Sequence, residues 1–108
     1  MAEEEVIVLL KKYIDLLNTE GLSVAKAFLF GSYSTGNESD MSDIDVLIVS
    51  DKFDENDDMA IGNMWRLTRK INSKIEPFLI GLKKFKEDTT SPLLNTIKTN
   101  GIEIKINA

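Results

Sequence analysis

Two aspartates one residue apart are the residues of this sequence best suited to chemistry. Asp43 and Asp45 open an apolar run rich in β-branched residues, which predicts a buried strand over residues 44–49. Side chains alternate between the faces of a strand, so both carboxylates project to one side, with backbones about 7 Å apart. Such a pair suffers repulsion and lost hydration, and a divalent cation held between the carboxylates removes both costs. All-oxygen ligands suit Mg²⁺ or Mn²⁺, although the two acids could also simply face solvent where the strand begins.

A Gly-Ser pair and a single glutamate are the other candidates. Gly31 and Ser32 follow an apolar run directly, where a glycine lets backbone N–H groups approach a phosphate and a hydroxyl adds a donor. An ordinary turn at a strand end is the alternative reading of this pair. Glu76 is the only acid in residues 66–86 and lies among apolar residues, where an unpaired carboxylate is costly. It can join the two aspartates if its strand lies beside theirs; otherwise it is an edge-strand charge that discourages aggregation.

Helices and strands alternate along the chain and must position these residues. Helices are predicted, from apolar residues at helical spacing and from capping residues, over residues 3–17, about 57–72 and 91–101. Strands are predicted, from short apolar or alternating runs, over residues 24–30, 44–49, 75–80 and 102–106. Pro77 points to a sheet edge or a bulge, because proline cannot donate to a strand ladder. This order predicts a single domain of the α/β class over residues 1–108.

Three polar segments connect these elements. Residues 32–42 are predicted to be a loop with room for one short helical turn, because they are rich in Ser, Thr, Gly, Asn and Asp. Residues 51–58 form an acidic connector. Residues 83–90 form a polar connector to which the sequence assigns no structure.

Composition excludes several classes of chemistry. The 108 residues are 43% hydrophobic and 29% charged, as in ordinary globular domains, and no apolar run approaches the roughly 20 residues of a membrane-spanning helix. With neither cysteine nor histidine, the chain cannot build a disulfide, a Ser-His-Asp triad or a histidine-ligated zinc site. The net charge of −5 counts against stable binding of nucleic acid. The acidic N-terminus is unlike a secretory signal and favours a cytoplasmic protein.

Charged residues are distributed unevenly, and two aromatic residues lie near the candidate site in sequence. Residues 38–58 hold nine of the eighteen acids, and residues 66–86 hold seven of the thirteen cations. These cations could serve a triphosphate or a partner surface, or be the solvated ends of a helix and a loop. Trp65 falls on the apolar stripe of its predicted helix, which favours core packing over nucleotide stacking. Tyr33 could lie over a nucleotide.

These residues together carry a resemblance to a known family. Gly31-Ser32, ten further residues, Asp43-Ile44-Asp45 and a later strand with Glu76 resemble the nucleotidyltransferase fold of DNA polymerase β-like enzymes. Gly36 and the sequence Ser-Asp-Ile-Asp of residues 42–45 also match that family. The short chain looks most like the minimal nucleotidyltransferases, which are often encoded beside a partner protein of the HEPN type. The resemblance covers nearly the whole chain and implies a mixed four-stranded sheet with helices.

The resemblance also implies a function and assigns roles to the candidate residues. Asp43 and Asp45 would hold metal ions on a nucleoside triphosphate, with two Mg²⁺ ions expected and Mn²⁺ as the alternative. Glu76 would complete the metal site and help to deprotonate the acceptor, and Gly31 and Ser32 would anchor the phosphates. The reaction would move a nucleoside monophosphate, AMP from ATP, onto an acceptor hydroxyl. A tyrosine of a HEPN-type toxin is the implied acceptor, which would make this chain an antitoxin.

Two departures from the family pattern leave alternatives open. Many family members carry aspartate where this chain has Glu76, and Pro77 follows it directly. Larger members carry a further domain for the acceptor, for which this chain has no room, so a partner chain or a second copy would complete the pocket. Three other readings remain: a non-catalytic antitoxin that masks its toxin, a transferase acting on a small molecule, and a nucleotide sensor without transfer.

Overall fold

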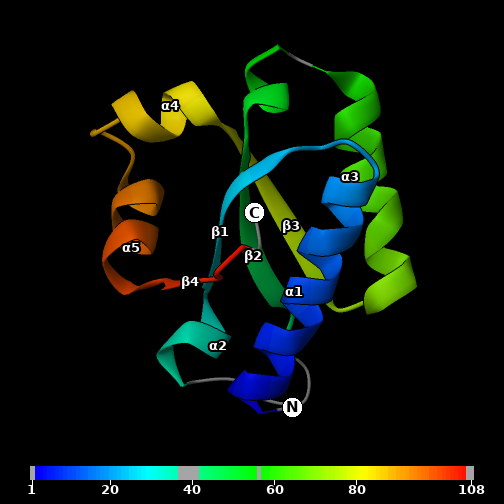
Figure 1. Ribbon diagram of the computed structural model, residues 1–108. Coiled ribbons are helices and arrows are strands. Elements are labelled where there is room, and N and C mark those ends of the chain that lie inside the picture. Colours follow the sequence, from blue (N-terminus) through cyan, green and yellow to red (C-terminus); the bar gives the residue numbers. More distant parts are fainter. Residues whose placement is uncertain (1, 37–41, 56, 107–108) are drawn as a thin grey trace.

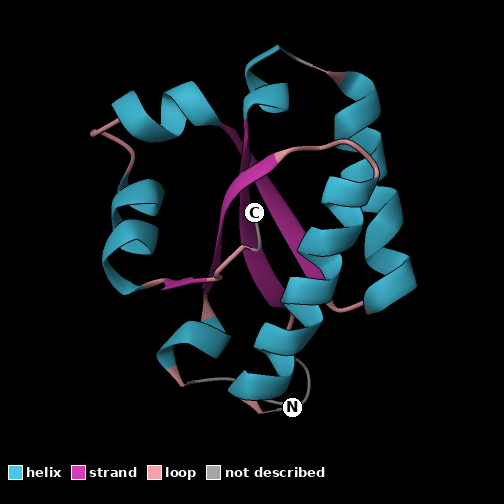
Figure 2. Ribbon diagram, viewed as in Figure 1, coloured by secondary structure: helices cyan, strands magenta, loops and turns pink. Residues whose placement is uncertain are grey.

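Four strands form one mixed sheet at the centre of the molecule (Figures 1 and 2). The computed structural model describes residues 2–36, 42–55 and 57–106. The strands are β1 (Val24–Phe30), β2 (Ile44–Ser50), β3 (Ile75–Gly81) and β4 (Ile102–Glu103), in the sheet order β3-β2-β1-β4. β1 is antiparallel to both β2 and β4, whereas β2 and β3 are parallel. The predicted α/β fold with a mixed four-stranded sheet is therefore confirmed.

Helices lie on both faces of this sheet. They are α1 (Glu3–Thr19), α2 (Ser32–Thr35), α3 (Asp58–Ile71), α4 (Leu82–Glu87) and α5 (Pro92–Asn100), with a 3₁₀ helix, η1, at Asp51–Glu55. α1 and α3 pack on one face, and α4 and α5 on the other (Figure 1). α2 follows β1 at the end of the sheet where β2 and β3 begin (Figure 1). None of the helices in the described ranges is long and apolar enough to cross a membrane.

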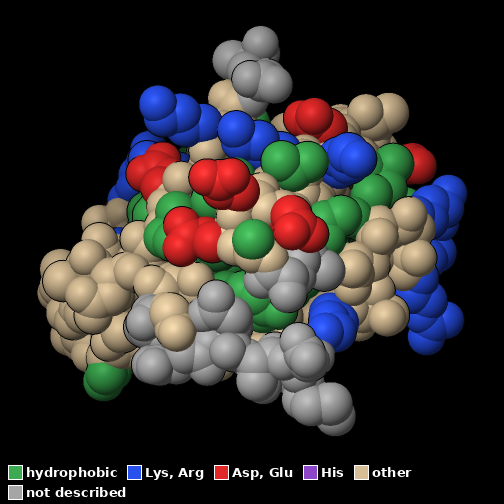
Figure 3. Space-filling view, turned by 90° about the horizontal axis from the view of Figure 1, so that it is seen from below, with side chains coloured by type: hydrophobic (Ala, Val, Ile, Leu, Met, Phe, Trp, Pro, Cys, Tyr) green, Lys and Arg blue, Asp and Glu red, His purple; other side chains and the backbone are tan. Residues whose placement is uncertain are grey.

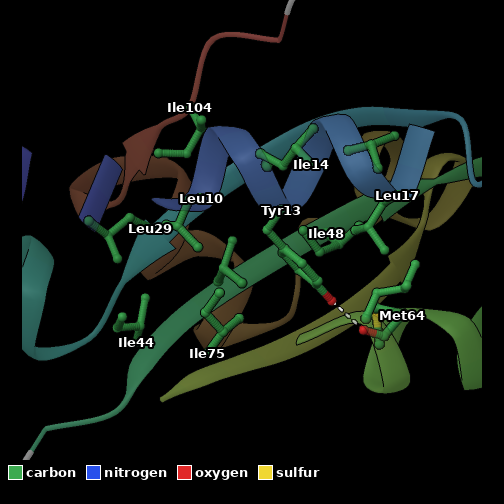
Figure 4. Close-up of a cluster of buried hydrophobic side chains, with 14 of the residues drawn as sticks. Leu10, Tyr13, Ile14, Leu17, Leu29, Ile44, Ile48, Met64, Ile75 and Ile104 are labelled. Carbon is green, nitrogen blue, oxygen red and sulfur yellow. Dashed lines mark hydrogen bonds between the residues drawn. The ribbon is translucent and has the colours of Figure 1, made fainter. Parts of the chain in front are cut away.

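Neighbouring residues of the strands supply two hydrophobic clusters, one on each face of the sheet. Leu29 and Ile48 belong to the cluster under α1 and α3 (Figure 4), whereas Phe28 and Leu47 belong to the cluster under α4 and α5. This division follows from the alternation of side chains along a strand. The continuous apolar run of β2 is therefore explained by burial on both faces.

One buried hydrogen bond connects the two helices of the larger cluster. The Tyr13 hydroxyl of α1 donates to the carbonyl oxygen of Met64 in α3 at 2.5 Å (Figure 4). Burial raises the pKa of Tyr13, so the phenol remains protonated and keeps this donor. The bond satisfies a polar atom that would otherwise be costly inside an apolar cluster.

Six predicted elements are confirmed within two residues at each end, and two predictions need correction. β4 ends at Glu103 rather than Ile106, although Ile104 N–H still donates to Ala27 O at 2.8 Å. Leu82–Glu87 form α4 in a segment to which the sequence assigned no structure. The capping group of α4 comes from far along the chain, because Asp54 Oδ2 accepts from Lys83 N–H at 3.1 Å. The helical turn allowed for in residues 32–42 is α2, and residues 37–41 lie outside the described part of the chain.

The prediction that Trp65 packs in the core is wrong. Met64, Leu67 and Thr68 are the buried residues of α3, while Trp65 is 48% exposed. Successive helical residues are about 100° apart, so the stripe that meets α1 leaves Trp65 at its margin. Apolar spacing alone did not decide which of two adjacent large residues faces the sheet.

Pro77 lies on an edge strand, as one of the two readings of the sequence required. β3 pairs with β2 on one side, and no described strand pairs with its other side. Ile44 N–H donates to Lys74 O at 2.8 Å, and the alternation along a parallel ladder turns the backbone of Pro77 outward. The missing N–H of proline therefore leaves the β2–β3 ladder intact and makes the outer edge a poorer template for another strand.

Candidate active site

The sheet register brings the predicted carboxylates together on one face. Asp45 in β2 is the direct partner of Glu76 in β3, and Phe30 in β1 is its partner on the other side. Asp43 directly precedes β2 and is exposed, whereas Asp45 and Glu76 are half-buried. Alternation places Asp45 on the face that carries Leu47 and the α4 and α5 helices. The condition for Glu76 to join the aspartates, a third strand beside the second, is met.

The pKa of Asp45 is raised by its surroundings. Burial raises the pKa of Asp45 above its ordinary value of 3.8, and the negative charges of Glu76 and Asp43 raise it further. The protein therefore holds carboxylates close together at a cost to the ionised state of Asp45. Carboxylates with raised pKa values are common at functional sites, where a bound ligand of opposite charge can stabilise the ionised form.

The turn after β1 lies directly against Asp45. Gly31 has φ 75° and ψ −147°, a conformation open to glycine and strained for other residues. A Cβ atom at Gly31 would overlap Asp45 Oδ2, so the missing side chain also makes space for the carboxylate. The carbonyl oxygen of Gly31 accepts from Ser34 N–H at 3.1 Å and from Ser34 Oγ at 3.0 Å, which holds the turn into α2. Gly31 and Ser32 are therefore adjacent to the carboxylates.

A groove continues from this turn toward α5. It has a volume of about 420 Å³ and is lined from one side by Phe30, Gly31 and Ser32. The residues of α5 that line it from the other side include Leu93, Thr96 and Asn100. Figure 3 looks onto the end of the molecule that carries α2, and acidic side chains gather there beside exposed hydrophobic ones. Sequence reasoning did not find the α5 residues, because only the tertiary structure brings this helix to the turn.

Other residues considered from the sequence do not meet at this site. Tyr33 is buried in the cluster under α1 and α3, on the opposite face from Asp45, and does not lie over the groove. Arg66, Arg69 and Lys70 are on α3, which also covers that opposite face. The three lysines of α4 follow the far end of β3 from Glu76. Lys74 is the exception: it directly precedes β3, its carbonyl oxygen accepts from Ile44 N–H at 2.8 Å, and it lies at the same end of the sheet as the carboxylates. The cations of residues 66–86 are therefore spread over several surfaces.

The chemical types present fit a divalent cation. Asp43, Asp45 and Glu76 supply only hard oxygen donors. Burial, together with the charges of Glu76 and Asp43, raises the pKa of Asp45, and a bound dication would relieve both effects. Within the described ranges, no three acidic side chains are already arranged as a metal cluster. Mg²⁺ is commonly held by one or two carboxylates together with waters and substrate phosphates, so a site without a complete protein cage suits this ion.

Comparison with known proteins assigns the chain to a family. Residues 10–102 match the family model described as "Nucleotidyltransferase domain". The fold is similar to the crystal structure at 1.40 Å resolution of a "putative nucleotidyltransferase" from Sulfolobus solfataricus, with a TM-score of 0.63. That likeness shows the shared fold: the two sequences are 17% identical, and the match covers 94% of this chain and 80% of the other. A search of curated proteins found no match. Because the family model spans most of the chain, the protein belongs to the nucleotidyltransferase domain family.

Proposed function

We propose that this chain is a metal-dependent nucleotidyltransferase that moves AMP from ATP to an acceptor hydroxyl. The observation that carries the proposal is the parallel pairing of β2 with β3, which sets Asp45 opposite Glu76 and beside the Gly31 turn. In a nucleotidyl transfer, the backbone turn would bind the phosphates of the donor, and the carboxylates would hold the metal beside the reacting phosphorus. The family supports transfer of a nucleotide, and the adenylyl group is part of our proposal.

Gly31 and Ser32 hold the phosphates of the donor in this proposal. The glycine allows the backbone conformation of this turn, and the backbone N–H groups of the turn and the Ser32 hydroxyl would donate hydrogen bonds to the phosphates. These donors are fixed before the substrate arrives, because Ser34 holds the turn through two hydrogen bonds to Gly31 O. Fixed donors lose little freedom when the phosphates bind, and this favours binding.

Asp43 and Asp45 would hold two Mg²⁺ ions in this proposal, and Mn²⁺ is the alternative metal. A bound divalent cation would stabilise negative charge on the attacking and leaving oxygens. The role of Asp45 in this arrangement is to keep an ionised carboxylate between the Gly31 turn, which follows β1, and Glu76 on β3. Asp43, which is exposed, lies two residues before Asp45 and therefore presents its carboxylate from the same face.

Glu76 would complete the metal site and would help to deprotonate the acceptor hydroxyl by accepting its proton. The acceptor oxygen then forms a bond to the α-phosphorus, and the bond from that phosphorus to the β-phosphate oxygen breaks, releasing pyrophosphate. Glu76 is suited to this role because it is half-buried and lies on an edge strand, which an acceptor can approach from outside the sheet. Phe78, two residues further on the same face, is 36% exposed and offers an apolar surface beside it.

The acceptor we propose is a tyrosine of a HEPN-type partner toxin, so that this chain acts as an antitoxin. The support is the resemblance of the motif from Gly31 to Glu76 to that of minimal nucleotidyltransferases, together with the outer edge of β3, with which no described strand pairs. Incubation of the chain with ATP labelled in the α-phosphate, Mg²⁺ and a candidate partner tests the proposal. Label should appear on the partner with the wild type and be lost with Asp43→Asn/Asp45→Asn.

A matched control distinguishes the site from a general effect of charge. Asp51→Asn/Glu55→Gln removes two exposed acids from η1 and should leave labelling unchanged. Tight binding of the partner without label in any version would overturn the transferase and favour masking of the toxin. Label on a small hydroxyl compound but on no protein would overturn the proposed acceptor and leave the transfer reaction in place.

A further inference from the structure

The groove beside Gly31 differs in charge from the neighbouring carboxylate site. We call it the α5 groove and define it by Phe30, Gly31, Ser32, Leu93, Thr96 and Asn100. None of the residues that line it is charged, although 29% of the chain is. Its volume of about 420 Å³ is in the range of small-molecule sites, and its lining combines apolar surface with a few hydrogen-bonding side chains. A charged group is poorly matched to such a groove, and a neutral group with polar edges is well matched.

The α5 wall of this groove is held in place by the sheet. Leu93, Thr96 and Asn100 lie on one helix face by their spacing, while Ile97 packs into the cluster with Phe28. β4 follows α5 immediately and pairs with β1, with Ile102 opposite Leu29. A Cβ atom at Gly101 would overlap Ile97 O and lie 3.3 Å from Leu29 O, so α5 ends in tight contact with β1. The groove is therefore formed before any ligand binds.

The order of groups across the sheet indicates which part of a substrate the groove faces. Glu76 is on β3, Asp45 on β2 and Phe30 on β1, and α5 lies beyond them next to β4. In an in-line displacement the pyrophosphate leaves opposite the acceptor, and the nucleoside extends sideways from the α-phosphate, so the nucleoside needs a space that adjoins the phosphate-binding turn and lies apart from Glu76. The α5 groove is such a space, because Gly31 and Ser32 line it and it lies on the side of β1 away from β3.

We propose that the α5 groove binds the nucleoside of the donor nucleotide. Phe30 and Leu93 would contact the base and sugar, and Thr96 and Asn100 would form hydrogen bonds to their polar edges, since an amide both donates and accepts. The uncharged lining accommodates a neutral nucleoside, while the triphosphate remains at the turn and the carboxylates. This inference rests on the proposed function, because it presupposes phosphates at Gly31 and Ser32.

Paired tryptophan substitutions on α5 test the proposal. Thr96→Trp places a large ring in the groove, whereas Thr99→Trp adds the same ring to the same helix at a residue that does not line it. Both threonines are exposed, so both variants are expected to fold, and thermal unfolding checks this. Isothermal titration calorimetry with Mg²⁺ then compares ATP with inorganic tripolyphosphate. Thr96→Trp should weaken ATP binding about tenfold or more and leave tripolyphosphate binding unchanged, and Thr99→Trp should change neither.

Each other outcome has a definite meaning. Unchanged ATP affinity in Thr96→Trp overturns the proposal, and so does equal weakening of ATP and tripolyphosphate, because the groove would then hold phosphates. A raised KM for the acceptor with unchanged ATP affinity would also overturn it and assign the groove to the acceptor. If the wild type binds neither ATP nor tripolyphosphate, the proposed function fails and this inference fails with it. Leu93→Ser, a milder change at a half-exposed residue, repeats the comparison without added bulk.

Discussion

The carboxylate of Asp45 occupies the space in which a side chain at Gly31 would lie. Asp45 is on β2, and Gly31 directly follows the neighbouring strand β1, whose last residue, Phe30, is the partner of Asp45 in the β1–β2 ladder. Gly31 also has a positive φ of 75°. One residue thus satisfies two separate requirements, a backbone conformation and a clearance, and a substitution there should disturb the turn and the carboxylate together.

Gly31→Ala should reduce both stability and transfer. The strained backbone should lower the free energy of unfolding by about 1–3 kcal/mol, and displacement of Asp45 should lower kcat by an order of magnitude or more. Gly21→Ala is the matched control, because Gly21 has φ 91° but no atom within 4 Å of an added Cβ. It should lose about 1–2 kcal/mol and keep full activity. Urea unfolding measures the stability of the two variants, and the labelling assay measures their activity. Equal activity would contradict the role of the space between Gly31 and the Asp45 carboxylate.

Asp45→Asn should stabilise the metal-free protein at neutral pH. Because the pKa of Asp45 is raised in the folded state, the folded protein binds a proton more readily than the unfolded chain between 3.8 and the raised value. The wild type therefore loses stability as pH rises through this window, and the asparagine variant lacks this loss. Thermal unfolding in EDTA should show a variant that is more stable at pH 7, with the difference shrinking as pH falls toward 3.8.

In Mg²⁺, the wild type should become more stable than Asp45→Asn, the reverse of the order expected in EDTA. An ion that binds the folded wild type raises its apparent stability by mass action, and Asp45→Asn should respond weakly. Asp51→Asn, an exposed acid of η1, should show neither the stabilisation in EDTA nor the lost response to Mg²⁺. A wild type that is insensitive to Mg²⁺, or an Asp45→Asn variant less stable in EDTA at every pH, would argue against a repulsive site that binds a cation.

Asp54→Ala should destabilise α4 from a distance along the chain. Asp54 Oδ2 accepts a hydrogen bond from Lys83 N–H at 3.1 Å, which satisfies a backbone donor in the first turn of α4. Loss of this cap should lower the free energy of unfolding by about 1 kcal/mol, measured by urea denaturation. Glu55→Ala changes the neighbouring exposed acid and should have little effect. A loss with Glu55→Ala as large as that with Asp54→Ala would point to general charge rather than to the cap.

Adjacent residues of α3 should respond in opposite ways to truncation. Met64 is fully buried, so Met64→Ala should lower the free energy of unfolding by about 2–5 kcal/mol. Trp65 is 48% exposed, so Trp65→Ala should cost about 1 kcal/mol or less, with circular dichroism following unfolding in both. Because Trp65 is the one tryptophan of the chain, strong quenching of its fluorescence by acrylamide gives an independent check. Weak quenching would indicate a buried side chain.

The sequence by itself determined the local elements and the shared strand face of Asp43 and Asp45. The period of two along residues 44–49 places Asp43 and Asp45 on one face without reference to any other part of the chain. The helical spacing of α1 and α3 and the Ser91 cap of α5 are likewise local, and Ser91 Oγ does accept from Leu94 N–H at 3.3 Å. The motif from Gly31 to Glu76 indicated the family that the comparison then showed.

The tertiary structure decided every relation between segments distant in sequence. The pairing of Asp45 with Glu76, the contact of Asp45 with Gly31 and the capping of α4 by Asp54 depend on which strands neighbour each other and in what register. Register is set by the packing of whole faces, because a shift of one residue moves every side chain of a strand to the other face. The same packing turned Met64 rather than Trp65 inward and brought α5 against the Gly31 turn. Local sequence patterns specify periodicity, and only the folded chain specifies which periodic faces meet.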